Sequence, residues 1–205
     1  MKIKATDIVT FAVIFVLVIG LGGMAGYKSD KDSKLPTNSF LFDSLNGREY
    51  LVAEDGGTFI VYLPLDTGQY YTMGFRLDPR ELRNLELDLS TLNATYNAKT
   101  IYTSVNPDDP GAKVGVAKLG LVRSISLVNP TKITESFVKD SDPINPDIPI
   151  KNCDDSTPEN LVIEFRIGSQ DKVYLAEDCV VIEGKDADSL IEVSDRLGYA
   201  LLGVY

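Results

Sequence analysis

The chain has 205 residues and a formal net charge of −10, from 20 Lys and Arg against 30 Asp and Glu, and it contains no histidine and no tryptophan. An acidic surface repels phosphate groups, so the composition excludes nucleic acid as a partner. The lack of histidine excludes Ser-His-Asp and Cys-His catalysis and imidazole metal sites. The sequence therefore offers no residue set that we would assign to catalysis, a cofactor or a metal ion.

The most apolar stretch is Ile8–Gly26, nineteen residues without a charge, an amide or a proline. As a helix it would be roughly 28 Å long, which is enough to cross the apolar core of a bilayer. We predict a transmembrane anchor at residues 8–26 behind a short cytoplasmic tail at residues 1–7. A cleaved secretory signal ending at Ala25 and a buried core helix remain as alternatives.

Lysines flank this apolar stretch on both sides. Lys2 and Lys4 precede it, and Lys28, Lys31 and Lys34 follow it, so the positive-inside rule gives almost a tie. A short tail is easily left in the cytoplasm while the rest of the chain is exported. We therefore expect a single-pass protein of the cell membrane whose C-terminal part lies outside the cytoplasm.

The exported part divides into a polar tether at residues 27–38 and a single extracytoplasmic domain at residues 39–205. Such a domain is long enough to bury a real core. Its two cysteines, Cys153 and Cys179, are most simply explained as one disulfide in an oxidising compartment. Two free buried thiols remain the alternative.

The first part of the domain has the pattern of an antiparallel meander. Three runs rich in β-branched and aromatic residues are separated by the turn signals Asp-Gly-Gly and Asp-Thr-Gly. These predicted strands are Glu49–Ala53, Thr58–Leu63 and Tyr70–Leu77. A short helical turn over residues 78–85 and a further strand over residues 85–90 are expected to follow.

The middle of the chain is less clearly patterned. Tyr96–Val105 is a strand candidate, and Ala112–Ile125 fits a helix, with a strand as the alternative because Gly115 and Gly120 interrupt it. Asn93 begins an Asn-Ala-Thr sequon and is a candidate glycosylation site.

The proline-rich stretch Asp140–Pro158 predicts a long surface loop. Oxygen ligands at Asp140, Asp142, Asn145 and Asp147 have a spacing that suits Ca²⁺. However, the glycine and the distal glutamate of an EF-hand loop are missing, so a solvated acidic loop is the favoured interpretation.

The C-terminal part predicts three strands followed by a long helix. The strands are Leu161–Ile167, Lys172–Ala176 and the nearly all-apolar Cys179–Glu183, and the helix is Asp186–Gly203.

The C-terminal helix should bury its leucine-rich face. Glu192 and Arg196 are expected as an i,i+4 pair on its solvent side. Asp195 beside Arg196 is interpreted as a surface pair or an internal bridge to a loop, rather than as an active pair.

The segment DCVVIEGKDADSLIEVSDRLGYALLGV, residues 178–204, resembles the C-terminal end of uncharacterised, singly anchored extracytoplasmic proteins of small-genome archaea. The shared pattern is a Cys-led apolar strand, a Gly-Lys turn, and a helix with Asp-Arg-Leu and Leu-Leu-Gly. Residues 75–88 resemble the same pattern. Val193 and Ser194 stand where alanines are more usual in it. The resemblance implies an extracytoplasmic mixed α/β domain and no particular activity.

Together these patterns predict an α+β fold: a mixed, mainly antiparallel sheet with the long C-terminal helix packed on one face, preceded by one transmembrane helix. For function we expect a membrane-anchored cell-envelope protein that acts as a non-enzymatic interaction or assembly module, with a protein partner in the envelope.

Two alternative functions stay open. A carboxylate-based envelope hydrolase would need two carboxyls about 5–10 Å apart, at least one with a raised pKa. A pilin-like subunit would use Lys4-Ala5-Thr6-Asp7 as a prepilin-peptidase site, although its acid comes too early for the usual pilin glutamate.

Overall fold

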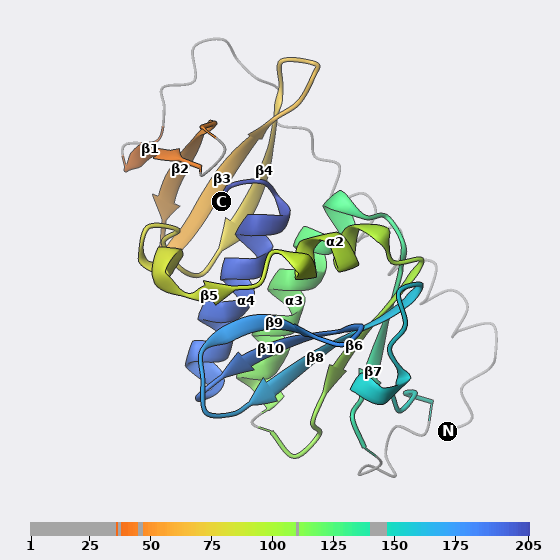
Figure 1. The fold of residues 1–205 in the computed structure, drawn as a ribbon. Coiled ribbons are helices and arrows are strands. Elements are labelled where there is room, and N and C mark those ends of the chain that lie inside the picture. Colours follow the sequence, from red (N-terminus) through yellow and green to blue (C-terminus); the bar gives the residue numbers. More distant parts are fainter. Residues whose placement is uncertain (1–35, 37, 45–46, 110, 140–146) are drawn as a thin grey trace, which may run out of the picture. The chain divides into compact units, whose positions relative to one another are not determined.

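The computed structural model describes residue 36 and residues 38–44, 47–109, 111–139 and 147–205 (Figure 1). The predicted tail and anchor, and most of the predicted tether, lie outside these residues. Among the helices that the structure describes, none has the length and apolar character needed to cross a bilayer. Pro36–Tyr205 form one compact unit.

The first part of this unit is a four-stranded sheet, antiparallel throughout, in the order β1-β2-β3-β4. Its strands are β1 (Ser39–Asp43), β2 (Glu49–Asp55), β3 (Thr58–Pro64) and β4 (Tyr70–Phe75). Gly56 and Gly57 both have positive φ, 57° and 79°, as a two-residue hairpin turn of this kind requires. The three predicted strands of the meander are confirmed, and β1 is an additional strand.

The second sheet has six strands in the order β5-β9-β10-β8-β6-β7. They are β5 (Glu86–Leu87), β6 (Thr100–Val105), β7 (Lys132–Phe137), β8 (Asn160–Ile167), β9 (Lys172–Ala176) and β10 (Cys179–Gly184). The β9–β10 pair is antiparallel, and the other pairs are parallel. A crossover helix between β6 and β7 returns the chain to the same end of the sheet, which permits parallel pairing there.

The helices are α2 (Ser90–Asn97), α3 (Gly111–Val128) and α4 (Ala187–Leu201), with 3₁₀ turns η1 (Glu81–Asn84) and η2 (Cys153–Asp155). The helix prediction for residues 112–125 is confirmed as α3. The predicted cap at Asp186 is also confirmed, because its Oδ1 accepts from the backbone N–H groups of Asp188 and Ser189 at 2.9 and 2.8 Å.

One local prediction was wrong. A strand was expected over residues 85–90, but only Glu86–Leu87 of these is extended and α2 begins at Ser90, whereas the strand expected over Tyr96–Val105 is present as β6 from Thr100. The cause is Asp88, whose Oδ1 accepts from the Ser90 N–H at 2.9 Å and the Ser90 hydroxyl at 2.7 Å. These local bonds turn the chain just before α2, where alternation suggested a strand.

The α+β class and the C-terminal helix are confirmed, with one antiparallel sheet and one mixed sheet. One sheet was expected and two are present, and α4 contributes to the core of both. Leu190, Val193, Leu197 and Leu201 of α4 pack with α3 and the six-stranded sheet. Tyr199 of α4 and the following Val204 pack with the four-stranded sheet. Each sheet thus buries one face against the same helix.

Gly184, at the end of β10, allows this close packing. A Cβ atom at position 184 would lie 2.4 Å from the backbone nitrogen of Leu190, whereas one at Gly115 in α3 would meet nothing within 4 Å. We expect Gly184→Ala to lower the free energy of unfolding by about 1–3 kcal/mol through overpacking. Gly115→Ala should raise it by about 0.5–1 kcal/mol through helix propensity.

Urea unfolding of the full chain in detergent micelles, followed by circular dichroism, measures both variants. If Gly184→Ala were as stable as the parent, the packing of α4 on β10 would be looser than described.

Candidate functional site

Two charged residues in the middle of α4 are buried. Asp195 is 5% exposed and Arg196 is 7% exposed. The prediction of Arg196 on the solvent side of the helix, paired with Glu192, was therefore wrong. The reason is that α4 packs on both sheets, so the side turned away from the six-stranded sheet is covered as well.

Asp195 is an internal bridge to a loop, one of the two structural roles expected for it. Its Oδ2 accepts hydrogen bonds from the backbone N–H groups of Arg76 at 2.7 Å and Leu77 at 3.0 Å, just after β4. A Cβ atom on Gly120 would lie 3.6 Å from Oδ1, so α3 passes close by. Burial raises the pKa of Asp195 to about 6, against the opposing effect of these hydrogen bonds.

Arg196 is held by different contacts. Its guanidinium lies 3.7 Å from the ring centroid of Tyr205, and its Nε donates to the carbonyl of Leu85 at 3.4 Å. Nη1 has no hydrogen-bond partner among the described residues, and burial lowers the pKa of Arg196. The Arg196 side chain thus fills space between α4 and the C-terminus rather than facing a ligand.

A groove of about 340 Å³ lies at the junction of α3, α4 and the end of β4. It is lined by Arg76, Leu77, Lys113, Val116, Asp188, Ile191 and Glu192. Lys113 and Asp188 neutralise each other across it through a 2.5 Å ion pair. Its basic and acidic groups are balanced, so the groove favours no charged ligand class.

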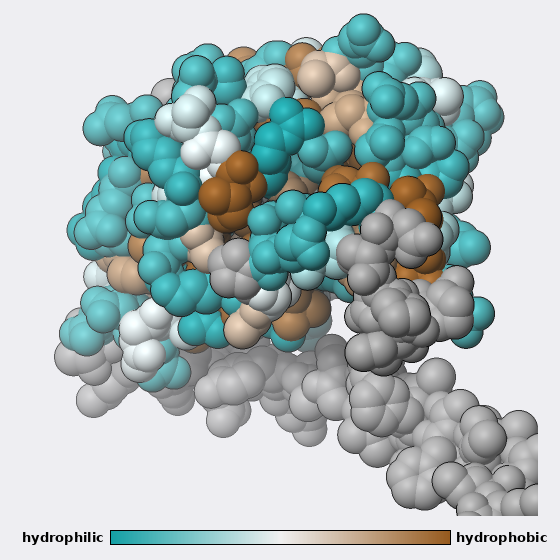
Figure 2. All heavy atoms as spheres, turned by 90° about the horizontal axis from the view of Figure 1, so that it is seen from below, coloured by the Kyte–Doolittle hydropathy of each residue, from teal (hydrophilic) through white to brown (hydrophobic). Residues whose placement is uncertain are grey.

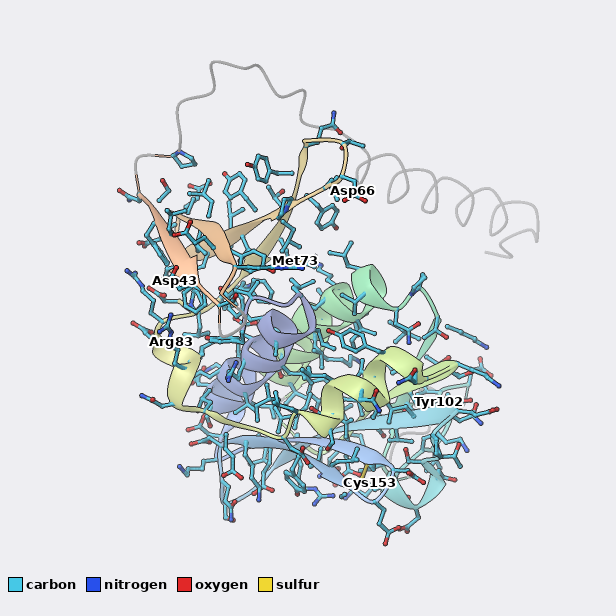
Figure 3. All side chains as sticks on the ribbon, turned by 45° about the horizontal axis from the view of Figure 1, so that its top comes forward. Asp43, Asp66, Met73, Arg83, Tyr102 and Cys153 are labelled. Carbon is cyan, nitrogen blue, oxygen red and sulfur yellow. A yellow bond between two sulfur atoms is a disulfide. The ribbon has the colours of Figure 1, made fainter. Side chains whose placement is uncertain are left out.

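The disulfide predicted from the cysteine count is present. It joins Cys153 of η2 to Cys179 of β10, with the Cα atoms 5.2 Å apart, on the face of the six-stranded sheet opposite α3 and α4 (Figure 3). With a sequence separation of 26, the closed loop stabilises the fold by about 3.5 kcal/mol on the chain-entropy estimate.

Two buried carboxylates share this outer face. Glu164 of β8 forms an ion pair with Arg166 at 2.6 Å. Glu183 of β10 accepts from the N–H groups of Ser169 and Gln170 and from the Tyr174 hydroxyl. Burial raises the pKa of Glu183, but these hydrogen bonds outweigh it and leave the pKa below its usual value.

These contacts bear on the hydrolase alternative, which requires a carboxyl whose raised pKa lets it donate a proton to a substrate. Glu183 has a lowered pKa, and Oε1 of Glu164 accepts two hydrogen bonds from Arg166. Burial raises the pKa of Asp109, Glu192 and Asp195, and of these the Asp195 carboxylate binds backbone inside the protein. The surface seen from below is largely hydrophilic, with separate apolar groups (Figure 2).

The outer face of the four-stranded sheet has a different character. Strand alternation puts Phe42, Val52, Val61 and Met73 in the core, and the other set outside. The outer set contains Leu41, Leu51, Ile60, Tyr62 and Tyr70, which we call the apolar outer face. Leu41 is 63% exposed and Tyr70 is 60% exposed, and the Tyr62 and Tyr70 rings are 6.2 Å apart.

The remaining predicted site residues are scattered. Asn93 is exposed on α2, while Thr95 of its sequon is buried and donates its hydroxyl to the Thr91 carbonyl at 2.8 Å. Of the four residues considered for Ca²⁺, only Asp147 is among the described residues. Lys4-Ala5, on which the pilin alternative depends, lies outside them.

None of the family models, curated proteins or solved structures compared with this chain matches it.

Sequence reasoning missed the apolar outer face because β1 was not predicted. The signal was present in Ser-Phe-Leu-Phe-Asp, whose alternation places Phe42 inside and Leu41 outside.

The bridge formed by Asp195 predicts a pH-dependent stability. Its folded-state pKa of about 6 lies above the unfolded value of 3.8, so the folded protein holds this proton more tightly. This tighter proton binding stabilises the folded state by up to about 3 kcal/mol in the free energy of unfolding. The stabilisation is complete below about pH 4 and is lost as the pH rises through 6. Asp195→Asn should lack this decline.

The measurement is urea unfolding of parent and variant between pH 4 and pH 8. Asp188→Asn, an exposed aspartate on the same helix, is the matched control and should follow the parent. Parallel curves for the parent and Asp195→Asn would contradict the assignment.

Proposed function

We propose that this protein is a membrane-anchored component of the cell envelope whose folded part is a non-enzymatic interaction module. The apolar outer face is its contact surface for another envelope protein. The single observation that carries the proposal is the exposure of Leu41 and Tyr70 on one face of a sheet whose other face is fully used by the core. Exposed aliphatic and aromatic clusters of this kind are typical of protein interfaces.

Charges around the apolar outer face support a protein partner over a lipid surface. The charged strand residues on the same side are Asp43, Glu49 and Asp55, all exposed. Strand positions on this face carry no lysine or arginine among the described residues. An acidic border repels anionic headgroups, and it complements a partner with an apolar centre bordered by basic residues.

The proposal predicts that Leu41 is more important for partner binding than Leu119. Leu41→Asp places a charge in the apolar outer face, while Leu119→Asp makes the same change on α3, where Leu119 is 53% exposed. Chemical crosslinking in intact membranes should give an adduct of the parent that maps to residues 39–74. Leu41→Asp should reduce it roughly tenfold or more, since a buried unpaired charge is costly.

Leu119→Asp should leave the adduct unchanged. An adduct insensitive to Leu41→Asp, equal losses in both variants, or no adduct in the parent would each contradict the proposed surface.

The proposed location outside the cytoplasm has its own test. In an oxidising compartment Cys153 and Cys179 stay paired, so intact-mass analysis of the native, membrane-extracted protein should show no thiol alkylation before reduction and two alkylated cysteines after it. Alkylation without reduction would indicate a domain facing the cytoplasm and would contradict the proposed location.

A further inference from the structure

We propose that reduction of the disulfide converts its surroundings into a three-ligand site for a thiophilic divalent cation of the Zn²⁺ class, formed by Cys153, Glu164 and Cys179. One ligand atom from each of these residues, the two Sγ atoms and a carboxylate oxygen, lies within 4.8 Å of the others. This site goes beyond the proposed interaction role, since it lies on the other sheet and uses different residues.

The strand register fixes two of the three ligands. In the parallel β8–β10 pair, Glu164 lies opposite Val181, so it shares the outer face with Cys179, two residues before Val181. Both side chains are buried on neighbouring strands of a sheet, which gives a rigid scaffold. Cys153 comes from η2 and is only half-buried, so the site has one side that solvent can reach.

Two turn contacts hold the third ligand in place. The Asn152 side chain accepts from the Asp154 N–H at 2.8 Å, and the Asp155 side chain accepts from the Asn152 N–H at 3.1 Å. These contacts involve neither cysteine, so η2 keeps its own turn when the S–S bond is broken. Ser156, directly after η2, donates its hydroxyl to the Asp178 carbonyl at 2.7 Å and accepts from the Val162 N–H at 2.9 Å, which keeps Cys153 near Cys179 after reduction.

Glu164 can offer an oxygen without losing its ion pair. Arg166 contacts Oε1 through Nε at 2.9 Å and through Nη2 at 2.6 Å. Oε2 accepts no hydrogen bond from a described residue. Two thiolates and one carboxylate around a divalent cation leave one net negative charge, and the adjacent Arg166 guanidinium compensates it.

Ligand chemistry selects the class of metal. Thiolates favour zinc-like soft cations over Ca²⁺ and Mg²⁺. A tetrahedral Zn²⁺ holds its ligand atoms about 3.4–3.8 Å apart, a spacing that the two sulfurs reach only after the bond between them is broken. Three protein ligands leave a fourth position for water, as in catalytic rather than structural zinc sites.

The chemistry balances with a named reductant. A trialkylphosphine gives two electrons to the S–S bond, which breaks. Water supplies the oxygen of the resulting phosphine oxide and the two protons of the two thiols. Binding of the cation then releases the two thiol protons.

The test uses the full chain in detergent micelles, reduced with a phosphine that is then removed under anaerobic conditions, and Co²⁺ as the probe. We expect a thiolate-to-Co²⁺ charge-transfer band in the reduced chain and none in the oxidised chain. Glu164→Gln should weaken Co²⁺ binding at least tenfold. Glu159→Gln, the same change at an exposed ion pair with Lys99, should leave it unchanged.

A second measurement separates the folded site from two loose thiols. Co²⁺ bound at the described site should raise the thermal unfolding midpoint of the reduced parent with increasing Co²⁺ concentration, because ligands stabilise the state that they bind. No charge-transfer band, equal affinities of Glu164→Gln and parent, or a band without a rise in the midpoint would each overturn the proposal.

Discussion

The structure depends on a small set of contacts between α4 and the segment just after β4. The Asp195 carboxylate accepts two backbone N–H groups there, from Arg76 and Leu77, and the Tyr199 hydroxyl donates to the Leu77 carbonyl at 2.8 Å. The Tyr199 ring also stacks on Phe75 at a centroid distance of 3.7 Å. These polar and aromatic contacts fix the four-stranded sheet on the helix that already forms the core of the six-stranded one.

This arrangement explains why a charge is retained in the interior. The N–H groups of Arg76 and Leu77 would each lose a partner if Asp195 were apolar, and a buried N–H without a partner is costly. The carboxylate satisfies both, at the expense of its own desolvation, which is why its pKa is raised. Gly198, one turn from Asp195, lets Phe75 and Ser124 approach α4 closely, since a Cβ atom at position 198 would lie 2.9 Å from both side chains.

Local patterns in the sequence were enough to predict the strands with clear alternation, the helix at residues 186–203 and the disulfide. They could not predict that α4 is covered on two sides. Glu192, Asp195 and Arg196 look like a solvent-facing stripe, yet Asp195 is buried and bonded to Arg76 and Leu77, more than a hundred positions earlier. Similarly, the partners that define the apolar outer face and the Cys153–Glu164–Cys179 cluster come from strand register, which has no local signal in the sequence.

Because α4 packs against the inner faces of both sheets, and α3 against that of the six-stranded sheet, the two outer faces carry different chemistry. The outer face of the six-stranded sheet carries a disulfide, two buried carboxylates and Arg166, so its shape is held by covalent and ionic contacts. The outer face of the four-stranded sheet carries aliphatic and aromatic groups with an acidic border. Links between the two sheets include the contacts of Asp195 and Tyr199 on α4 and the side chain of Leu85, which packs against both cores.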